Sequence, residues 1–359
     1  MNQIKSILNE FGLNADEYQI KPFGNGLINL TWKISGEKNY ILQQINTGVF
    51  LQPEAIAENL LLLEAYLKYY HPDYLFVAPI PTLNGSYMVK TEEGYFRIFP
   101  FIENSATINE VRHHKQAYEA ARQFGKLTLL LKQFDPHKLK YTLTHFHDLN
   151  LRFEQFQLAC SQAEKTRLLK AYTAIRAINR NSTITRVYQQ IIKNNELPLR
   201  VIHHDAKINN VLFDKDWNGM CLVDLDTVMP GHFISDTGDM LRTYLSPVGE
   251  EESDLSKIKI DEKCFYAIYD GYMSVMGEEL TPTEREYFVY SGKYMIYMQA
   301  MRFLTDYLNG DAYYHTTYEE HNLNRTHNQL TLLYELIKLE YEIFKKKIVK
   351  SNIEKGRIS

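Results

Sequence analysis

The hydrophobic positions divide this chain into two unlike parts. Up to about residue 102 they form short runs, rich in β-branched and aromatic residues and separated by Gly, Asn or charged turns, which is typical of strands. One longer segment, 53–70, has helical spacing, with Pro53 suited to its first turn. The predicted strands are residues 18–23, 28–34, 39–43, 86–90 and 95–101.

After residue 103 the apolar spacing becomes mainly helical, and the polar loop 245–260 is expected to be mobile. The predicted fold is therefore α+β and bilobal. An N-terminal lobe, 1–102, contains an antiparallel sheet plus one helix, and a mainly helical lobe, 103–359, follows it. Helices are predicted at 108–134, within 144–192 with a break near 161 or 179–183, and at 261–276, 283–309 and 326–347.

The most informative segment, 200–226, combines a loop with a tight hairpin. Apolar residues on both sides of the polar turn 214–219 predict two paired strands, and the turn ends in Asn-Gly, a strong hairpin signal. Pairing centred on Trp217 places the carboxamide of Asn210 opposite the carboxylate of Asp224. Two oxygen-bearing side chains are thus expected at the open end of the hairpin.

This arrangement suits phosphoryl transfer, which needs a divalent cation on the phosphates and a carboxylate that orients the attacking hydroxyl. Asn210 and Asp224 supply the metal ligands, and Asp205 is placed to accept the hydroxyl proton. Lys207 follows this base and is expected to neutralise the transferred phosphoryl group. The spacing H-x-D-x-x-x-x-N is the catalytic-loop pattern of kinases and predicts a protein-kinase-like fold with a catalytic hairpin.

Neighbouring polar residues admit other interpretations. Asp226 is expected either to position the metal or substrate or to cap its loop, and Asp239 to receive backbone N–H bonds from the catalytic loop. The pair His203-His204 before Asp205 also fits a metal-dependent phosphohydrolase, but no later His–Asp spacing completes such a set. His203 is therefore predicted to support the loop by packing.

Two segments of the first lobe predict a nucleotide site. Gly24-Asn25-Gly26 lies between the first two predicted strands, with Asn29 after it, and its glycines let backbone N–H groups approach phosphates at positive φ. Phe101 and Ile102 follow the last predicted strand, where their backbone groups are expected to read the adenine edge.

The third predicted strand lacks the lysine that kinases usually place there. Gln43 or Gln44 can donate to a phosphate but carries no charge, so the missing cation must lie elsewhere, on Lys207 or Arg97. Glu58, on the interrupting helix, is either the group that orients this substitute or a solvated helix residue.

Composition narrows the class of protein. The chain has 359 residues, and its net charge of −4 gives no reason to expect nucleic-acid binding. No apolar run approaches the ~20 residues that span a bilayer, and no signal peptide opens the chain, so no membrane association is expected. Three cysteines without ligand spacing fit a reducing cytoplasm. Protein partners and the oligomeric state are left open.

Three strings carry a family resemblance: His204-Asp-x-Lys-x-Asn-Asn-Val-Leu212, Val223-Asp-Leu-Asp-Thr-Val-Met-Pro-Gly231 and Asp236-Thr-Gly-Asp-Met-Leu-Arg242. They resemble the phosphotransferase enzyme family typified by aminoglycoside and choline kinases, and within it the N-acetylhexosamine 1-kinases. The likeness spans nearly the whole chain, and the missing lysine matches this subgroup. It implies ATP and Mg²⁺ as cofactors and a sugar, GlcNAc or GalNAc, that is phosphorylated on its anomeric hydroxyl.

The late segments 302–314 and 321–329 carry the part of the resemblance that points to a sugar. Arg302 offers a fork of donors for sugar oxygens, while Tyr313 and Tyr314 offer flat apolar faces for a pyranose ring. Alternatively, Arg302 pairs with a nearby aspartate and the tyrosines belong to the core. The predicted substrate contacts are Asp205, Asp226, Arg302, Tyr313, Asn322 and Arg325.

Three rival functions remain. A kinase of another small alcohol (choline, homoserine or an aminoglycoside) shares the catalytic residues, but a cationic acceptor needs an acidic pocket, whereas Arg302 and Arg325 are basic. A protein kinase is disfavoured because no Asp-Phe-Gly or Ala-Pro-Glu string is present. A non-catalytic nucleotide-binding scaffold would explain the missing lysine, but not the presence of a base with both metal ligands.

Overall fold

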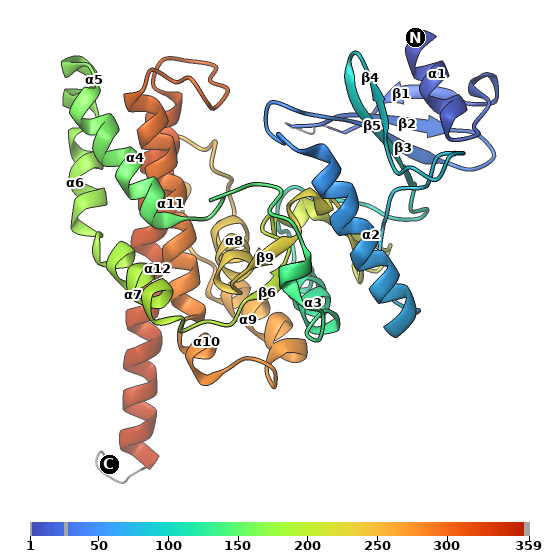
Figure 1. The fold of residues 1–359 in the computed structure, drawn as a ribbon. Coiled ribbons are helices and arrows are strands. Elements are labelled where there is room, and N and C mark those ends of the chain that lie inside the picture. The colour runs from blue at the N-terminus through green and yellow to red at the C-terminus, as the bar shows by residue number, and fades with distance from the viewer. Residues whose placement is uncertain (1, 25–27, 355–359) are drawn as a thin grey trace.

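The computed structural model describes residues 2–24 and 28–354 and has two lobes (Figure 1). The N-terminal lobe contains a five-stranded antiparallel sheet in the order β1-β2-β3-β5-β4. The predicted α+β kinase-like fold is confirmed. The first elements are α1 (Asn2–Glu10), β1 (Gln19–Pro22), β2 (Leu30–Ser35), β3 (Tyr40–Ile45), β4 (Val89–Thr91) and β5 (Gly94–Pro100).

The two faces of this sheet differ because successive side chains of a strand point to opposite faces. One face carries Ile34, Leu42 and Ile98, which form a small core together with residues of α1. The other face carries Gln43 and Arg97, which are cross-strand neighbours on β3 and β5. This polar face lies toward the second lobe, where Arg97 finds its ion-pair partner.

Helix α2 (Pro53–Tyr70) connects the sheet to the second lobe (Figure 1). Its apolar residues Ile56 and Leu60 belong to the large core of the C-terminal lobe rather than to the small core of the sheet. The Asn59 amide donates to the Lys140 carbonyl of that lobe at 2.8 Å. Helix α2 is therefore held against the lobe that carries the catalytic loop.

Helix α11 (Phe288–Leu308) runs through the C-terminal lobe and packs against α4, α8 and α12 (Figure 1). It is buried on nearly every side, because apolar and tyrosine side chains occur all around it. The other helices are α3 (His114–Leu130), α4 (Leu149–Gln162), α5 (Lys165–Lys170), α6 (Tyr172–Arg180), α7 (Thr183–Asn194), α8 (Ile234–Tyr244), α9 (Glu262–Met276), α10 (Pro282–Glu286) and α12 (His321–Glu354).

Two short antiparallel pairs frame the catalytic segment. Strand β6 (Arg200–Ile202) pairs with β9 (Met229–Gly231), and β7 (Val211–Phe213) pairs with β8 (Gly219–Leu222). The catalytic loop lies between β6 and β7, so one pair fixes each of its ends.

Some predicted boundaries were wrong. The first helix of the second lobe begins at His114 rather than near 108, because the preceding segment forms a bridge between Ala106 and Phe213. The region 144–192 forms the separate helices α4 to α7, and α8 was not predicted. The loop 245–260, expected to be mobile, is tied down by side chains of α8 and α12. None of the helices in the described part of the chain is long and apolar enough to cross a membrane.

Candidate active site

The catalytic loop is fixed by a buried carboxylate of α8. Asp236 accepts the backbone N–H groups of His203 (2.9 Å) and His204 (2.7 Å). The prediction gave this task to Asp239, which instead pairs with Arg242 at 2.9 Å. Because α8 was not predicted, the sequence offered no way to choose between two aspartates three residues apart.

The side chains before the base support the loop from within. His204 adopts a left-handed conformation with φ of 66°, and its ring bonds to the Thr227 carbonyl. His203 is buried, and its ring bonds to the Val223 carbonyl at 3.1 Å. This agrees with the predicted packing role of His203.

Asp205 lies between a cation and an amide. Its carboxylate is 2.9 Å from the Lys207 ammonium and accepts a 2.9 Å hydrogen bond from the Asn210 amide, while 22% of the side chain stays exposed. Burial acts to raise the pKa of Asp205, but the Lys207 ammonium, His203 and Asn210 outweigh it and hold the pKa below its ordinary value. Asp205 is therefore an ionised, accessible acceptor of hydrogen bonds.

The hairpin register differs by one residue from the prediction. Val211 pairs with Leu222, and the Val223 N–H donates to the Asn210 carbonyl, so Asn210 lies opposite Val223 rather than Asp224. A bulge before the turn shifts the pairing. Asp224 then takes a left-handed conformation, with φ of 56°, at the end of the strand.

Asp224 is nevertheless brought into the acidic centre of the site. Asp224 is exposed. Desolvation by the protein around its carboxylate, together with the negative charges of Asp226 and Asp205, nevertheless raises its pKa to about 7. Arg97 and Lys207 oppose this rise. Asp224 is thus the accessible carboxylate of the cluster, suited to bind a cation.

Asp226 is already occupied by side chains of the other lobe. One carboxylate oxygen lies 2.5 Å from an Arg97 nitrogen, and the other accepts a 2.9 Å bond from the Asn29 amide. The Asp226 side chain is only 2% exposed. In this structure Asp226 thus joins the two lobes, and its contact with metal or substrate stays a prediction.

The rest of the predicted nucleotide site surrounds this contact. Gly24 has φ of 75°, as the prediction requires, whereas Asn25 and Gly26 lie outside the described residues. Gln43 accepts hydrogen bonds from Arg97. Glu58 pairs with the exposed Lys140, so it is the solvated helix residue of the two interpretations.

The segment after β5 leaves one acceptor and one donor unused. The Phe101 N–H donates to the Asn39 carbonyl at 3.0 Å, and the Ile102 carbonyl accepts from the Ser105 hydroxyl at 2.6 Å. Among the described residues, the Phe101 carbonyl and the Ile102 N–H have no such partner. The adenine edge presents one donor and one acceptor, which this pair complements.

The predicted acceptor region divides into two halves. Arg302 donates to Gln299 at 3.2 Å and its guanidinium lies over the rings of Phe146 and Tyr314, with no carboxylate partner among the described residues. Tyr313 is 69% exposed, and its backbone N–H is held by Asp306. These two side chains are available to a ligand.

The side chains of Asn322 and Arg325, in contrast, are engaged by other residues of the chain. The fully buried Asn322 amide donates to Asp306 and Asp311, both at 2.9 Å, and accepts from Arg325. Arg325 also binds Glu251 at 2.6 Å. Internal bonds thus use their polar groups in this structure, and their contact with substrate stays a prediction.

A carboxylate that the sequence analysis missed lies nearby. Glu250 accepts a 2.7 Å bond from Arg242 and contributes to the raised pKa of Tyr314, for which burial is the main cause. Glu250 lies in the loop 245–260, whose polar sequence predicts mobility rather than a fixed site. A signal was present in the Gly-Glu-Glu-Glu run a few residues after Arg242.

The comparisons with known proteins agree with this geometry. Residues 19–255, more than half of the chain, match the Phosphotransferase enzyme family. The chain belongs to that family.

Solved structures show the same fold. The chain is similar to an aminoglycoside phosphotransferase from Alicyclobacillus acidocaldarius (12% identity, TM-score 0.65, covering 95% of this chain and 96% of that one). It is also similar to a microcompartment-associated aminopropanol kinase (14%, 0.66, 95% and 98%) and to a choline kinase from Cryptosporidium parvum (15%, 0.55, 98% and 98%). At these identities the likeness shows a shared fold.

In this phosphotransferase, the donor set near the base fits a magnesium ion. The described residues contain no cluster of three His, Cys, Asp or Glu ligands. Mg²⁺ needs no such cage, because it is bound by one or two side-chain oxygens, water and substrate phosphates. Both bonds of the Asn210 amide nitrogen go to Asp205, its amide oxygen has no hydrogen-bond partner within the described part of the chain, and Asp224 is exposed.

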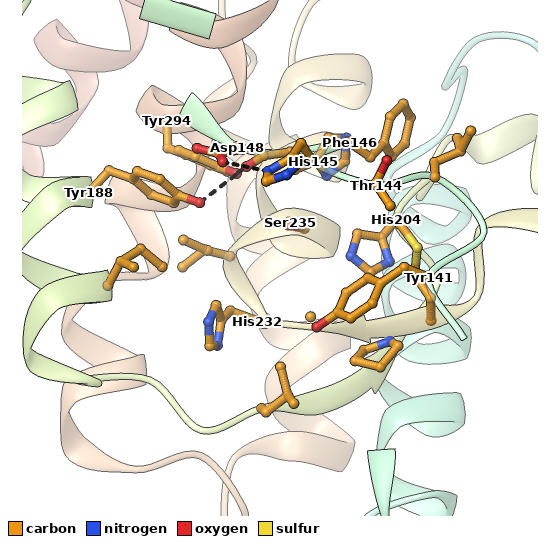
Figure 2. A pocket seen from close by; sticks show the side chains of 18 residues that line it. Tyr141, Thr144, His145, Phe146, Asp148, Tyr188, His204, His232, Ser235 and Tyr294 are labelled. Atoms are coloured by element: carbon orange, nitrogen blue, oxygen red, sulfur yellow. Dashed lines mark hydrogen bonds and ion pairs between the residues drawn. The ribbon is translucent and has the colours of Figure 1, made fainter. Parts of the chain in front are cut away.

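This phosphotransferase also has a cavity of about 350 Å³ within the C-terminal lobe, and Figure 2 draws the side chains that line it. His204, Tyr188 and Tyr294 line it, and both tyrosines donate to the His147 carbonyl. None of the predicted site residues lines this cavity. The predicted site residues therefore lie apart from this cavity.

Proposed function

We propose that this chain is an ATP-dependent kinase that phosphorylates the anomeric hydroxyl of an N-acetylhexosamine, GlcNAc or GalNAc, to give the sugar 1-phosphate and ADP. One observation carries the proposal. Asp205 is ionised, accessible and fixed between Lys207 and Asn210, with the accessible carboxylate of Asp224 in the same cluster.

The residues of the cluster divide the work of transfer. Asp205 orients the acceptor hydroxyl by accepting its hydrogen bond, and takes its proton as the new oxygen–phosphorus bond forms and ADP leaves. Lys207 balances charge near the transferred group. Asn210 and Asp224 would hold Mg²⁺, which neutralises charge on the phosphates. Positioning and charge neutralisation account for most of the catalysis in this class of reaction.

Two regions of the cleft support ATP as the donor. The Phe101 carbonyl and Ile102 N–H, unpaired among the described residues, suit adenine, and Asn29 is bonded to Asp226 of the acidic cluster. Related solved structures include a spectinomycin phosphotransferase in complex with ADP and an amicoumacin kinase in complex with AMP-PNP and Ca²⁺.

Arg302 and Tyr313 support a sugar as the acceptor. Arg302 has no acidic partner among the described residues and lies over aromatic rings, so its donors can turn to hydroxyl or acetamido oxygens. The exposed ring of Tyr313 offers a face for a pyranose. A neutral, oxygen-rich acceptor suits a free guanidinium better than a cationic one does.

A second candidate is a kinase of a small amino alcohol, as the names of several similar structures suggest. Glu250 favours it, because this carboxylate reaches the acceptor region and Glu251 neutralises Arg325. Of the two arginines that disfavour a cationic acceptor, Arg325 is neutralised by Glu251, so Arg302 alone opposes such an acceptor among the described residues of this region.

A panel of acceptors separates the two candidates. ADP release is measured with GlcNAc, GalNAc, choline, ethanolamine, homoserine and an aminoglycoside, and the product is examined by phosphorus NMR. The proposal expects release with an N-acetylhexosamine and a phosphate on C1 of the sugar. Release with amino alcohols alone, or a phosphate on a primary carbon, would overturn it.

A further inference from the structure

A buried ion pair joins the two lobes at the place where kinases put a lysine. Arg97 of β5 and Asp226 are 1% and 2% exposed, with 2.5 Å between them. The same Arg97 donates twice to Gln43 on β3, at 2.9 and 3.2 Å. Gln43 is its cross-strand partner in the sheet, so the guanidinium lies beside the strand that lacks the lysine.

The charges near the base require this cation. Asp205 lies 2.9 Å from the Lys207 ammonium, and Asp226 lies 2.5 Å from the Arg97 guanidinium, with Asp224 two residues before Asp226. An incoming triphosphate would add further negative charge to three carboxylates. With Gln43 neutral, Arg97 is the positive charge that the N-terminal lobe brings to Asp226.

The guanidinium is also held in one orientation with a donor to spare. Gln43 and Asp226 engage two of its nitrogens, and the ring of Phe99 lies 4.8 Å away. Its third nitrogen, Nη1, is buried and has no hydrogen-bond partner among the described residues. A buried unpaired donor on a charged group is costly, so a ligand oxygen is the expected partner.

We propose that Arg97 replaces the missing lysine as the phosphate-binding cation of the N-terminal lobe, and that Asp226 replaces the helical glutamate that would orient it. The proposal rests on the proposed use of a nucleoside triphosphate. Asn29 also binds Asp226, so the same carboxylate holds Arg97 and the residue just before β2. Arg97 binds a phosphate oxygen, and Asp226 acts through Arg97 as a positioning residue.

The test compares binding of adenosine and ADP, each with Mg²⁺, by calorimetry. Arg97→Lys keeps a charge but loses the fork. The double variant Arg97→Gln with Asp226→Asn removes both charges and leaves no unpaired buried carboxylate, so it is expected to fold. Arg200→Lys is the matched control, since Arg200 forms a similar buried pair with Glu284 in the other lobe.

The double variant is expected to bind adenosine as the wild type does and ADP roughly tenfold to a hundredfold more weakly. Arg97→Lys should bind ADP with an affinity between those of the wild type and the double variant. Adding Gln43→Lys to Arg97→Gln/Asp226→Asn should restore part of the ADP affinity, because it returns a cation to β3. The control should bind both ligands normally.

Equal ADP affinity in the wild type and the double variant would overturn the inference, and so would an equal loss for adenosine and ADP. The proposed function is tested separately by the acceptor panel. A wild type that binds ADP through Arg97 but phosphorylates no sugar would refute the sugar kinase and leave this inference standing. A wild type that does not bind ADP would refute both.

Discussion

The catalytic segment 200–226 and the acceptor segment 302–325 are both rich in polar residues, yet the structure uses them differently. In the first, Asp205 and Asp224 stay accessible, because backbone bonds to Asp236 and the hairpin hold the loop. In the second, Asn322 and Arg325 are consumed by internal bonds. Polar side chains are left for chemistry where other groups hold the backbone.

The largest effect is expected when the catalytic base, Asp205, is removed from the first segment. Asp205→Asn should lower kcat by about 10²–10⁴-fold while ADP binding persists, because an amide still accepts a hydrogen bond but cannot take the proton. Coupled ADP-release kinetics and calorimetry measure the two effects. Asp216→Asn, on the exposed turn of the same hairpin, is the matched control and should be neutral. Near-normal turnover in Asp205→Asn would remove Asp205 from the mechanism.

Within the acceptor segment, substitution of Arg302 should mainly affect acceptor binding, whereas substitution of Asn322 should mainly affect stability. Arg302→Ala should raise the acceptor KM roughly tenfold to a hundredfold and lower the unfolding free energy by less than about 1 kcal/mol, since within the protein it loses only a neutral 3.2 Å bond to Gln299 and its contacts with the Phe146 and Tyr314 rings. Asn322→Ala should lower the unfolding free energy by about 1–3 kcal/mol, because Asp306 and Asp311 lose a buried donor. Chemical denaturation and steady-state kinetics measure both.

The reverse outcome would contradict the division of that segment. An Asn322→Ala variant with normal stability and a raised acceptor KM would make Asn322 a substrate contact. An Arg302→Ala variant that is destabilised with an unchanged acceptor KM would make Arg302 structural.

Sequence reasoning succeeded where the deciding contacts are local. Asp205, Lys207 and Asn210 lie within six residues of sequence, and their spacing alone brings them together. Alternation along β3 and β5 likewise places Gln43 beside Arg97. The hairpin register failed by one residue, because a bulge adds a residue that hydrophobic pattern does not reveal.

The sequence does not predict which distant residues pair with one another. Asp226 is bound by Arg97 and Asn29, which are more than a hundred residues away in sequence. Glu251 binds Arg325 of α12, which is 74 residues away in sequence. A buried polar residue needs a hydrogen-bond or ion-pair partner, but its sequence position does not identify that partner. The partners of Asp226 and Arg325 are therefore known only from the fold.

The anchoring of the catalytic loop predicts a pH-dependent difference in stability. Burial raises the pKa of Asp236 from 3.8 to about 7, although two backbone N–H bonds oppose this. A raised pKa means that the folded state binds the proton more tightly than the unfolded state. The stability from this group is therefore present at low pH and is lost as pH rises through about 7.

Comparison with Asp236→Asn isolates this titration. The unfolding free energy of the wild type minus that of the variant should decrease between pH 4 and pH 7, with a slope of at most about 1.4 kcal/mol per pH unit. Urea denaturation at a series of pH values measures it. A difference that grows with pH over this range would mean that the N–H bonds outweigh burial.

The smallest effect is expected at the rim of the acceptor segment. Glu251 is 56% exposed and binds both Arg325 and His321, so its bonds are those of a surface ion pair. Glu251→Gln should therefore lower the unfolding free energy by only about 0–1 kcal/mol, and less at high salt. It should also free Arg325 and so weaken any cationic acceptor relative to a neutral sugar. The ratio of kcat/KM for a sugar to that for an amino alcohol measures this directly. A ratio that stays constant would show that Arg325 does not reach the acceptor even when released, and that its role is to hold the loop 245–260 in place.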